Sequence, residues 1–453
     1  MGYRAYPDYK ESGVTGLDRV PSHWTTWKAT HGFAKIGSGT TPKSDNANYY
    51  DGDIAWVTTS ELRERPIFET QIKLTKQALQ DYPTLKTYSP HSLIIAMYGA
   101  TIGRLGILEI EATVNQACCV FSDPEQFDTK FFYYWLWMWR PTLLALSAGG
   151  GQPNLSQDTL KQIRAPAPHV TEQQTIANFL DHKTAQIDSL IDKKQELIEK
   201  LQEQRIATIT QAVTKGLDRS SALKNSGIEW LGDIPEHWDI LRLRFSVTMS
   251  GGMTPSTTAP QYWEGSIPWV TPKDMKSDRI TSSIDTLTEL ALEETSLQLY
   301  TSGQVLIVVR GMILAHTFPV GVNDAEVTVN QDMKVLSTTL NSEYLAILLR
   351  GFQSVVLSIV EESAHGTKVL RTDLLKDIQL PVPPSHEQET IVAYIHRVIA
   401  KTDSRVEAVN TAIERLQEYR TALITAAVTG QIDVRDWQAP EPTKESAANK
   451  EVA

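Results

Sequence analysis

The 453-residue sequence is poor in cysteine and has no long apolar run. Its two cysteines, Cys118 and Cys119, are neighbours in NQACCVF and cannot readily bridge each other, and no cluster of Cys and His supplies the ligands of a metal site. Because secreted chains of this size usually carry more cysteines, we expect a cytoplasmic protein. The most apolar run, residues 131–139 (FFYYWLWMW), is far shorter than the roughly 20 residues of a membrane helix and predicts a buried helix instead.

Motifs of nucleotide binding and hydrolysis are also missing. The sequence has no GxxxxGK[ST], HExxH or GxSxG, and nothing resembles the Asn/Asp-Pro-Pro-aromatic motif of amino methyltransferases. The glycine-rich GGGQPNLS at 149–156 is compatible with a phosphate cradle, but its counterpart HGTKVLRT at 365–372 lacks the glycines, which favours a flexible loop. We therefore expect a binding and organising protein that holds no cofactor, metal or catalytic residue of its own.

Excess positive charge is a third absence. The formal net charge is −11, and no segment of the chain forms a basic block. This balance argues mildly against a nucleic-acid partner, so DNA binding would need a local basic face or a basic partner protein.

What the sequence does contain is a tandem duplication. The Ser-Gly and Pro-x-His-Trp of SGVTGLDRVPSHW (12–24) return with the same spacing in SGIEWLGDIPEHW (226–238). Five further pairs follow in the same order at an offset of 213 to 215 residues: GSGTTP and SGGMTP, DGDIAWVT and EGSIPWVT, TVNQ and TVNQ, LKQIRAPAPHVTEQQTIANFL and LKDIQLPVPPSHEQETIVAYI, EKLQEQRIATITQAVT and ERLQEYRTALITAAVT. Chance does not produce such an ordered series, so the chain consists of two copies of one unit.

Each copy has two parts. Short β-rich runs separated by Gly, Pro, Asn and Ser turns predict an α+β globular domain with a substantial sheet. A proline-rich hinge then precedes a proline-free stretch in which apolar residues recur every 3.5–3.6 residues, which predicts a long helix. We expect a first globular domain, a long helix, a second globular domain, a second long helix and a disordered polar tail, over residues 1–170, 171–215, 216–385, 386–433 and 434–453.

Each long helix carries one apolar stripe, which needs a partner to bury it. Since the other copy offers the matching stripe, we predict that the two helices pair as an antiparallel coiled coil. The residues expected to pack between the helices are Ile176, Leu180, Ile187, Leu197, Leu201, Ile391, Ile395, Val409, Ile413 and Leu416.

These motifs resemble those of specificity subunits of type I restriction–modification systems. The resemblance rests on SGIEWLGDIPEHW, the Thr-Pro turns of GTTP and MTP, IPWVT, RGMILAHTFPVG, TVNQ, the proline hinge and AAVTGQID, and it covers both halves in family order. It implies that each globular part is a target-recognition domain for one half of a split DNA sequence. It also implies that the helices fix the half-site spacing and dock two modification subunits. Those subunits would carry S-adenosylmethionine and methylate adenine, and a motor-nuclease subunit would join them for restriction in host defence.

The two halves differ where readers of different sequences should differ. MYGATIGRLG at 97–106 contrasts with RGMILAHTFPVG at 310–321, so we expect an asymmetric target. Arg and Lys suit guanine edges and phosphates, whereas Asn and Gln suit adenine. Our DNA-binding candidates are Thr41, Lys43, Arg104 and Gln152 in the first domain and Thr254, Lys273, Arg310, His316 and Lys368 in the second, although a turn-forming or merely solvated role fits each equally well. We interpret the Asn-Gln pairs of the two TVNQ motifs as turn-holding residues.

Two alternative hypotheses of function stay open. A coiled-coil scaffold whose heads bind proteins would explain the acidic balance, but it does not explain two divergent β-rich heads that carry the same turns. An enzyme with its own methylase or nuclease centre is disfavoured by the missing motifs. Salt-dependent DNA binding distinguishes the first hypothesis from the scaffold.

Overall fold

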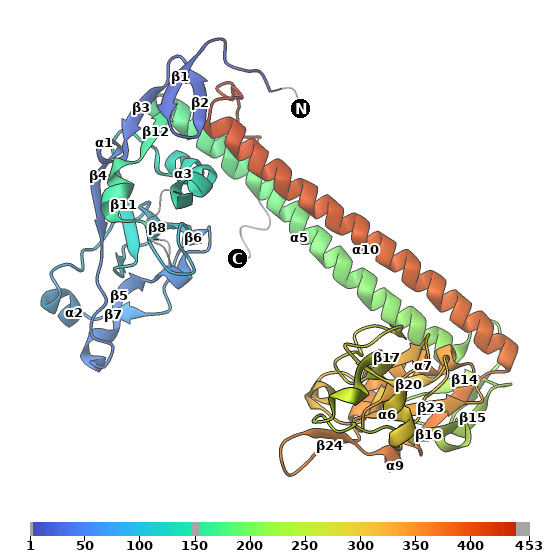
Figure 1. The fold of residues 1–453 in the computed structure, drawn as a ribbon. Coiled ribbons are helices and arrows are strands. Elements are labelled where there is room, and N and C mark those ends of the chain that lie inside the picture. Colours follow the sequence, from blue (N-terminus) through green and yellow to red (C-terminus); the bar gives the residue numbers. More distant parts are fainter. Residues whose placement is uncertain (1–2, 146–153, 441–453) are drawn as a thin grey trace. The chain divides into compact units, whose positions relative to one another are not determined.

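The computed structural model describes residues 3–145 and 154–440 (Figure 1). They form two compact units: unit 1 comprises residues up to Lys194 together with those from Thr411 onward, and unit 2 comprises residues 195–410. Each unit thus combines one globular head with part of each long helix. Within the described part of the chain, no helix has the length and apolar character needed to span a membrane.

The head of unit 1 is built on two sheets. The five-stranded sheet has the order β4 (Phe33–Ser38), β11 (Cys118–Pro124), β8 (Leu93–Ala96), β9 (Leu105–Leu108) and β6 (Pro66–Ile67). The three-stranded sheet has the order β10 (Thr113–Val114), β5 (Tyr50–Val57) and β7 (Lys73–Leu74). Around these sheets lie β1 (Tyr9–Val14), β2 (Leu17–Pro21), β3 (Thr25–Lys28), α1 (Ala29–Gly32), α2 (Lys76–Asp81), α3 (Thr129–Ala145), α4 (Gln157–Gln162) and β12 (Arg164–Ala167).

One sequence prediction is confirmed in this head. The apolar run 131–139 lies within α3, where Phe132 and Trp135 are buried and stack with ring centroids 6.1 Å apart. Cys118 and Cys119 are both fully buried on β11. Burial raises the pKa of Cys119 to about 12, so its thiol stays neutral at physiological pH.

The head of unit 2 repeats the five-stranded and the three-stranded sheet of unit 1. Its five-stranded sheet has the order β16 (Val247–Gly251), β23 (Met333–Thr338), β20 (Val305–Val308), β21 (Val320–Asn323) and β18 (Arg279–Ile280). Its three-stranded sheet contains β19 (Asp285–Leu287), β17 (Trp263–Val270) and β22 (Thr328–Val329). The remaining elements are β13 (Leu223–Asn225), β14 (Asp233–Pro235), β15 (Asp239–Arg242), α6 (Glu289–Glu294), α7 (Ser342–Gly351), α8 (Gln353–Leu357), β24 (Val360–Glu362), β25 (Lys368–Leu370), α9 (Thr372–Leu375) and β26 (Gln379–Val382).

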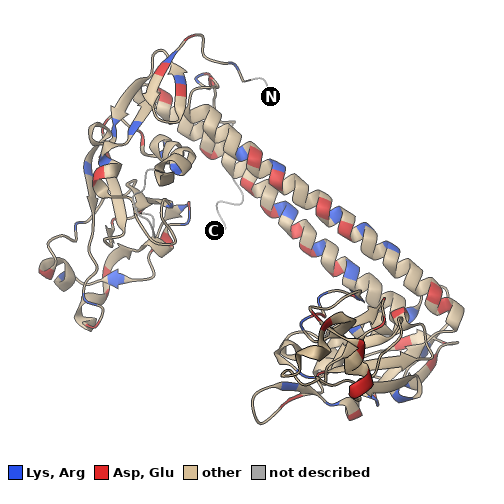
Figure 2. Cartoon of the chain, in the orientation of Figure 1, with Lys and Arg blue, Asp and Glu red and all other residues tan. Residues whose placement is uncertain are grey.

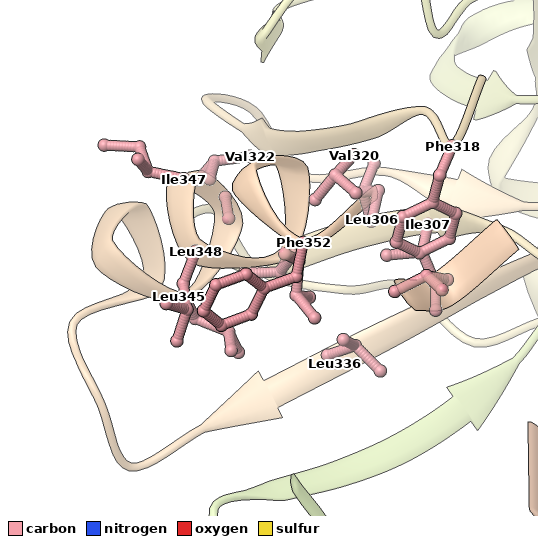
Figure 3. Packing of buried hydrophobic residues seen from close by; sticks show 14 of the residues in the cluster. Leu306, Ile307, Phe318, Val320, Val322, Leu336, Leu345, Ile347, Leu348 and Phe352 are labelled. Atoms are coloured by element: carbon pink, nitrogen blue, oxygen red, sulfur yellow. The ribbon is translucent and has the colours of Figure 1, made fainter. Parts of the chain in front are cut away.

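The core of this second head lies between α7 and the five-stranded sheet. Figure 3 shows Leu345 and Leu348 of α7 packed beside Leu306, Val320 and Leu336 of the sheet. All five side chains are 4% exposed or less. The short apolar runs that predicted strands are thus the inner face of a closed hydrophobic core.

The two long helices are α5 (Val170–Lys215) and α10 (Ser385–Val428). In unit 1 the beginning of α5 packs on the end of α10, and Asp188 accepts a hydrogen bond from Arg420 Nε at 2.9 Å. In unit 2 the end of α5 lies beside the beginning of α10, and Arg205 Nη1 donates to Asp403 Oδ1 at 2.8 Å. The helices therefore pair in antiparallel fashion, as predicted, and Figure 1 shows them side by side.

The residues predicted to pack between these helices differ in burial. Ile176, Leu180, Ile187, Ile391, Ile395 and Ile413 are at most 9% exposed, and Leu201, Val409 and Leu416 are half-buried. Leu197 is a correction, since its side chain is 43% exposed. A pair of helices covers only a narrow seam, so a stripe that also faces outward at mid-helix stays in contact with solvent.

The predicted boundary of the disordered tail also needs correction. Val434 is only 3% exposed, and the Trp437 ring meets Phe179 edge-on with centroids 5.6 Å apart. The chain after α10 is held in unit 1 because these apolar side chains reach its core. Residues 441–453, the rest of the predicted tail, lie outside the described residues.

The duplicated Pro-x-His-Trp motif is an anchor between head and helix. Trp24 Nε1 and His23 Nε2 contact the Glu172 carboxylate of α5 at 3.2 and 3.0 Å. In unit 2, Trp238 Nε1 and His237 Nε2 contact Glu387 of α10 at 3.1 and 2.8 Å. The repeated Pro-x-His-Trp motif thus connects the head to a long helix in both units.

The end of the opposite helix meets the same anchor in each unit. Gly430, just after α10, has φ +71° and approaches Pro21 and Trp24, while Gly216, just after α5, has φ +70° and approaches Trp238. A positive φ favours glycine, and a side chain at either position would also meet these rings. Each head is therefore fixed to the start of one long helix and to the end of the other.

Candidate nucleic-acid interface

In each head, several of the candidate residues lie where a parallel pair of strands ends. In unit 1, β10 runs parallel to β5 with Val114 opposite Val57, and the Asn115 N–H donates to the Val57 carbonyl at 3.0 Å. In unit 2, β22 runs parallel to β17, and the Asn330 N–H donates to Val270 at 3.1 Å. Since parallel strands end at the same edge, the segments that follow them emerge together.

A glycine turn is clamped onto this edge. Thr41 Oγ1 donates to Gln116 Oε1, and Thr254 Oγ1 donates to Gln331 Oε1 at 2.7 Å. The glycine of each turn lies against a carbonyl oxygen, because a Cβ at Gly39 would sit 1.6 Å from the Val114 oxygen and one at Gly252 would sit 1.7 Å from the Val329 oxygen. The glycine of each Gly-x-Thr-Pro motif is therefore required, because any side chain there would clash with the backbone of the neighbouring strand. We call the pairs Thr41–Gln116 and Thr254–Gln331 the Thr–Gln clamps.

The two TVNQ motifs form the other side of each clamp. Asn115 Oδ1 accepts a hydrogen bond from the Ala117 N–H, and Asn330 Oδ1 accepts one from the Asp332 N–H, both at 3.1 Å. These are the turn-holding contacts expected from the sequence. The asparagines shape the turn, and the glutamines hold the threonines.

Two other candidates of the first head lie near this edge or on its outer turn. The Met97 N–H donates to the Ala117 carbonyl at 2.7 Å, which places the turn ending at Arg104 next to the TVNQ turn. Arg104 is exposed. Lys43 is exposed as well, and its N–H donates to Tyr82 Oη at 3.1 Å. Gln152 lies outside the described residues.

In the second head, contacts draw three candidates together. Arg310 Nε lies 4.0 Å from Asp332 Oδ1, next to Gln331 of the clamp with Thr254. The Gly311 N–H donates to the Lys368 carbonyl at 3.0 Å, so the β24–β25 hairpin joins the same cluster. Lys368 Nζ donates to Glu362 at 2.7 Å, and this hydrogen bond lowers the pKa of the Glu362 carboxyl. Thr254, Arg310 and Lys368 thus meet at one edge, although both cations have acidic neighbours.

The last two candidates are not part of these contacts. Lys273 is exposed in the loop that follows β17. His316 is exposed just after the short helix Met312–Ala315, and its N–H donates to the Ile313 carbonyl at 3.1 Å. Their part in binding stays a prediction.

The electrostatic character of the heads is mixed. Figure 2 shows Lys and Arg interspersed with Asp and Glu over both heads and both helices. Across residues 3–145 and 154–440, His, Cys, Asp and Glu form no group of three or more suited to a metal ion. What each edge offers is a set of exposed or half-buried hydroxyl, amide and cationic groups, which are the groups that bind base edges and phosphates.

Sequence reasoning missed two residues of these edges. Asp332 follows directly on TVNQ and partly neutralises Arg310, whereas the equivalent residue in the first copy is Ala117. Tyr82 supports Lys43 from a segment 39 residues away. The mismatch after TVNQ was a usable signal for Asp332, but no local pattern marked Tyr82.

Comparison with known proteins gives consistent matches. A family model for the type I restriction modification DNA specificity domain matches residues 21–200 and 235–415. The type I restriction enzyme MjaIX specificity subunit of Methanocaldococcus jannaschii is 24% identical, over 96% of this chain and 98% of that protein. The EcoR124I/EcoR124II specificity subunit of Escherichia coli is 28% identical, over 64% of this chain and 68% of that protein.

Solved structures share the fold. A chain from a structure of the type I R-M system, described in terms of complex assembly and conformational transition, has a TM-score of 0.71 at 13% identity and covers 91% of this chain and 99% of that chain. The HsdS subunit from Thermoanaerobacter tengcongensis has a TM-score of 0.57 at 15% identity, over 92% of this chain and 99% of that chain.

Proposed function

Because this chain belongs to the family of type I restriction modification DNA specificity domains, we propose that it is the non-catalytic specificity subunit of such a complex. Each head reads one half of an asymmetric, bipartite DNA target. The two long helices set the spacing between the half-sites and dock two adenine-methyltransferase subunits. Those subunits bring S-adenosylmethionine, and a motor-nuclease subunit completes the restriction complex in the cytoplasm.

One observation carries the half-site assignment. The Thr–Gln clamp is built twice with the same geometry, but the groups around it differ: Ala117 and Arg104 in unit 1 stand against Asp332, Arg310 and the β24–β25 hairpin in unit 2. A shared frame with different surface groups is what two readers of different sequences require.

Exposed apolar residues on α5 support the docking role. Leu190 is 48% exposed in unit 1, and Ile206 is 66% exposed in unit 2. These apolar side chains are accessible to a protein partner that packs against the helix. Such a partner would also supply phosphate contacts that a chain of net charge −11 does not provide in bulk.

The primary test is a map of adenine methylation in host DNA, obtained by long-read sequencing with the gene intact and deleted. We expect one gapped, methylated motif to disappear on deletion and to return on complementation. If the modification subunits are expressed and no gapped motif depends on this gene, the proposed function is wrong.

The scaffold alternative is tested with the purified complex of this chain and the modification subunit. Specific DNA binding should weaken by about 10³-fold or more between 50 and 200 mM salt, because phosphate contacts release counterions. A scaffold that binds only proteins would show no such dependence.

A further inference from the structure

A loop leaves the candidate interface in each head directly after the central strand. Residues 58–71 follow β5, and residues 271–284 follow β17 at the constant offset of the duplication. Thr58 and Thr271 begin these loops beside the TVNQ turns, since Val57 and Val270 accept the N–H groups of Asn115 and Asn330. We call these segments the reading loops.

One carboxylate closes each reading loop. Glu61 accepts the Thr58 N–H at 3.0 Å through one oxygen and the Gln71 N–H at 2.8 Å through the other. Asp274 does the same in unit 2. It accepts the N–H groups of Thr271 and Ile284 at 2.8 and 2.7 Å. Each loop is therefore tied at its two ends by a single side chain, as in compact surface loops.

A hydroxyl group of each loop binds the central strand, and an acidic residue of each loop pairs with an arginine of a helix. Thr70 Oγ1 accepts the Trp56 N–H at 3.3 Å, and Ser283 Oγ accepts the Trp269 N–H at 2.9 Å. Ion pairs tie each loop to a helix: Arg140 of α3 contacts Glu64 at 2.7 Å, and Arg350 of α7 contacts Asp278 at 2.6 Å.

Apolar side chains anchor the middle of each loop. Leu62 and Ile67 are at most 5% exposed in unit 1, and their counterparts Met275 and Ile280 are at most 7% exposed in unit 2. Both ends and the middle of each loop are thus fixed in the folded chain. Little conformational entropy of the loop would therefore be lost when its outward side chains bind a ligand.

The outward positions differ between the heads although the apolar and hydroxyl anchors match. Phe68 and Glu69 are exposed in the first loop, where the second loop has Thr281 and Ser282. Arg65 is exposed as well, at the position where the second loop has Asp278, the partner of Arg350. Phe68 is 69% exposed and lines a surface hollow together with Arg63 and Arg65. A large aromatic ring held in solvent beside two arginines has no role in the core of its own head.

One outward position keeps its charge. Arg63 and its counterpart Lys276 are both basic and exposed. A cation at the same place in both frames suits a contact that carries no sequence information, such as a phosphate.

We propose that the reading loops are specificity-determining elements of the two heads. Arg63 and Lys276 contact phosphates, and Arg65 and Phe68 contact base edges in the half-site of the first head. The second head uses its own outward residues, among them Lys273, Thr281 and Ser282. This inference rests on the proposed function and extends it to named residues that the sequence motifs did not mark, apart from Lys273.

The test exchanges loops within the chain. Residues 62–70 (LRERPIFET) are replaced by residues 275–283 (MKSDRITSS), which have the same length and equivalent apolar and hydroxyl anchors, while the acidic residue moves from position 64 to position 65. The full chain is expressed with its modification subunits, and host DNA is mapped for methylated adenine. We expect the bases of one half-site to change while the other half-site and the gap stay the same.

A point variant keeps the test decisive if the exchanged loop fails to fold. Phe68→Ala alters only an exposed side chain, so folding should be unaffected. We expect about ten-fold slower methylation of the original target, or relaxed preference at one or two bases of one half-site. Phe245→Ala is the matched control, because Phe245 is 71% exposed but lies outside both reading loops.

The outcomes separate this inference from the proposed function. If Phe68→Ala keeps the motif and stays within about two-fold of the wild-type rate, the loop inference is wrong, while the wild-type motif still supports a specificity subunit. The loop inference is also overturned if Phe245→Ala has the same effect as Phe68→Ala. A wild-type chain with no gapped motif contradicts the proposed function itself.

Discussion

At the scale of single residues, a glutamate at the start of each long helix connects that helix to its head. Glu172 accepts hydrogen bonds from Tyr6 Oη at 2.8 Å and from Trp24 Nε1 at 3.2 Å, and it contacts His23. Burial, followed by the hydrogen bond to Glu172, raises the pKa of Tyr6 well above its usual value, so Tyr6 remains a donor. One carboxylate thus connects the N-terminal segment, the anchor motif and α5.

Glu172→Ala should therefore destabilise unit 1. The Trp24 indole is fully buried, so its N–H would lose its partner at a cost of about 1–3 kcal/mol. We expect a lower urea midpoint for the purified chain. Glu203→Ala, at an exposed position of α5, is the control. Equal midpoints for the two variants would contradict the anchor role.

A second residue-scale prediction concerns the glycine of the clamp. In Gly252→Ala the new Cβ would lie 1.7 Å from the Val329 oxygen, so the turn must move away from β22. We expect a loss of about 1–3 kcal/mol in unfolding free energy, measured by denaturant unfolding, together with slower methylation of the target by the assembled complex.

Gly351→Ala is the matched control in the same head, since its nearest neighbour would be Val213 Cγ2 at 3.8 Å, an ordinary contact. If Gly252→Ala were as well tolerated as Gly351→Ala, the close approach of turn and strand would not be required.

At the scale of elements, the long helices owe their stability to packing rather than to their apolar stripe as such. In unit 1, Ile187 shares a core with Leu423 and Ile424 of α10. Leu197 belongs to the same sequence stripe but remains 43% exposed. Periodicity therefore predicts the helix, while burial depends on what faces each turn.

Ile187→Ala and Leu197→Ala should consequently differ. Ile187 is 5% exposed, so its truncation leaves a cavity that costs about 2–4 kcal/mol. Leu197→Ala should stay within about 0.5 kcal/mol because solvent already reaches its side chain. Denaturant unfolding of the two purified variants provides the measurement, and similar losses would show that the two positions are equally packed.

At the scale of the whole molecule, the duplication places two equivalent heads and two equivalent helices in one chain. Each head is joined to both long helices through its own anchor, His23–Trp24 in unit 1 and His237–Trp238 in unit 2. Under the proposed function, a change in helix length should therefore alter the spacing between the half-sites and leave their bases unchanged.

Insertion of four residues after Lys194, about one helical turn, tests this separation. With the modification subunits present, methylation mapping should show a changed gap between half-sites whose bases are unchanged. A control insertion after Gln438, in the described end of the chain beyond α10, should leave the gap as it was. Altered bases with an unchanged gap would contradict the spacer role.

The duplication, the two long helices, the buried apolar run of α3 and the family could all be predicted from the sequence. These features depend on local order, namely repeats, periodicity and contiguous motifs, which are visible without contacts. The boundary of the tail was misjudged because Trp437 is recognisable as a core residue only once Phe179 is beside it.

Which distant residues contact one another could not be predicted from the sequence and is seen only in the folded chain. Gln331 holds Thr254 across 77 residues, and Glu172 holds Trp24 across 148 residues. The two reading loops can be recognised as equivalent only from the structure, in which Glu61 and Asp274 accept hydrogen bonds from the same backbone positions of their loops. Such contacts arise from folding of distant segments onto one edge, and the surface positions that differ between the heads obey no periodicity that a sequence could reveal.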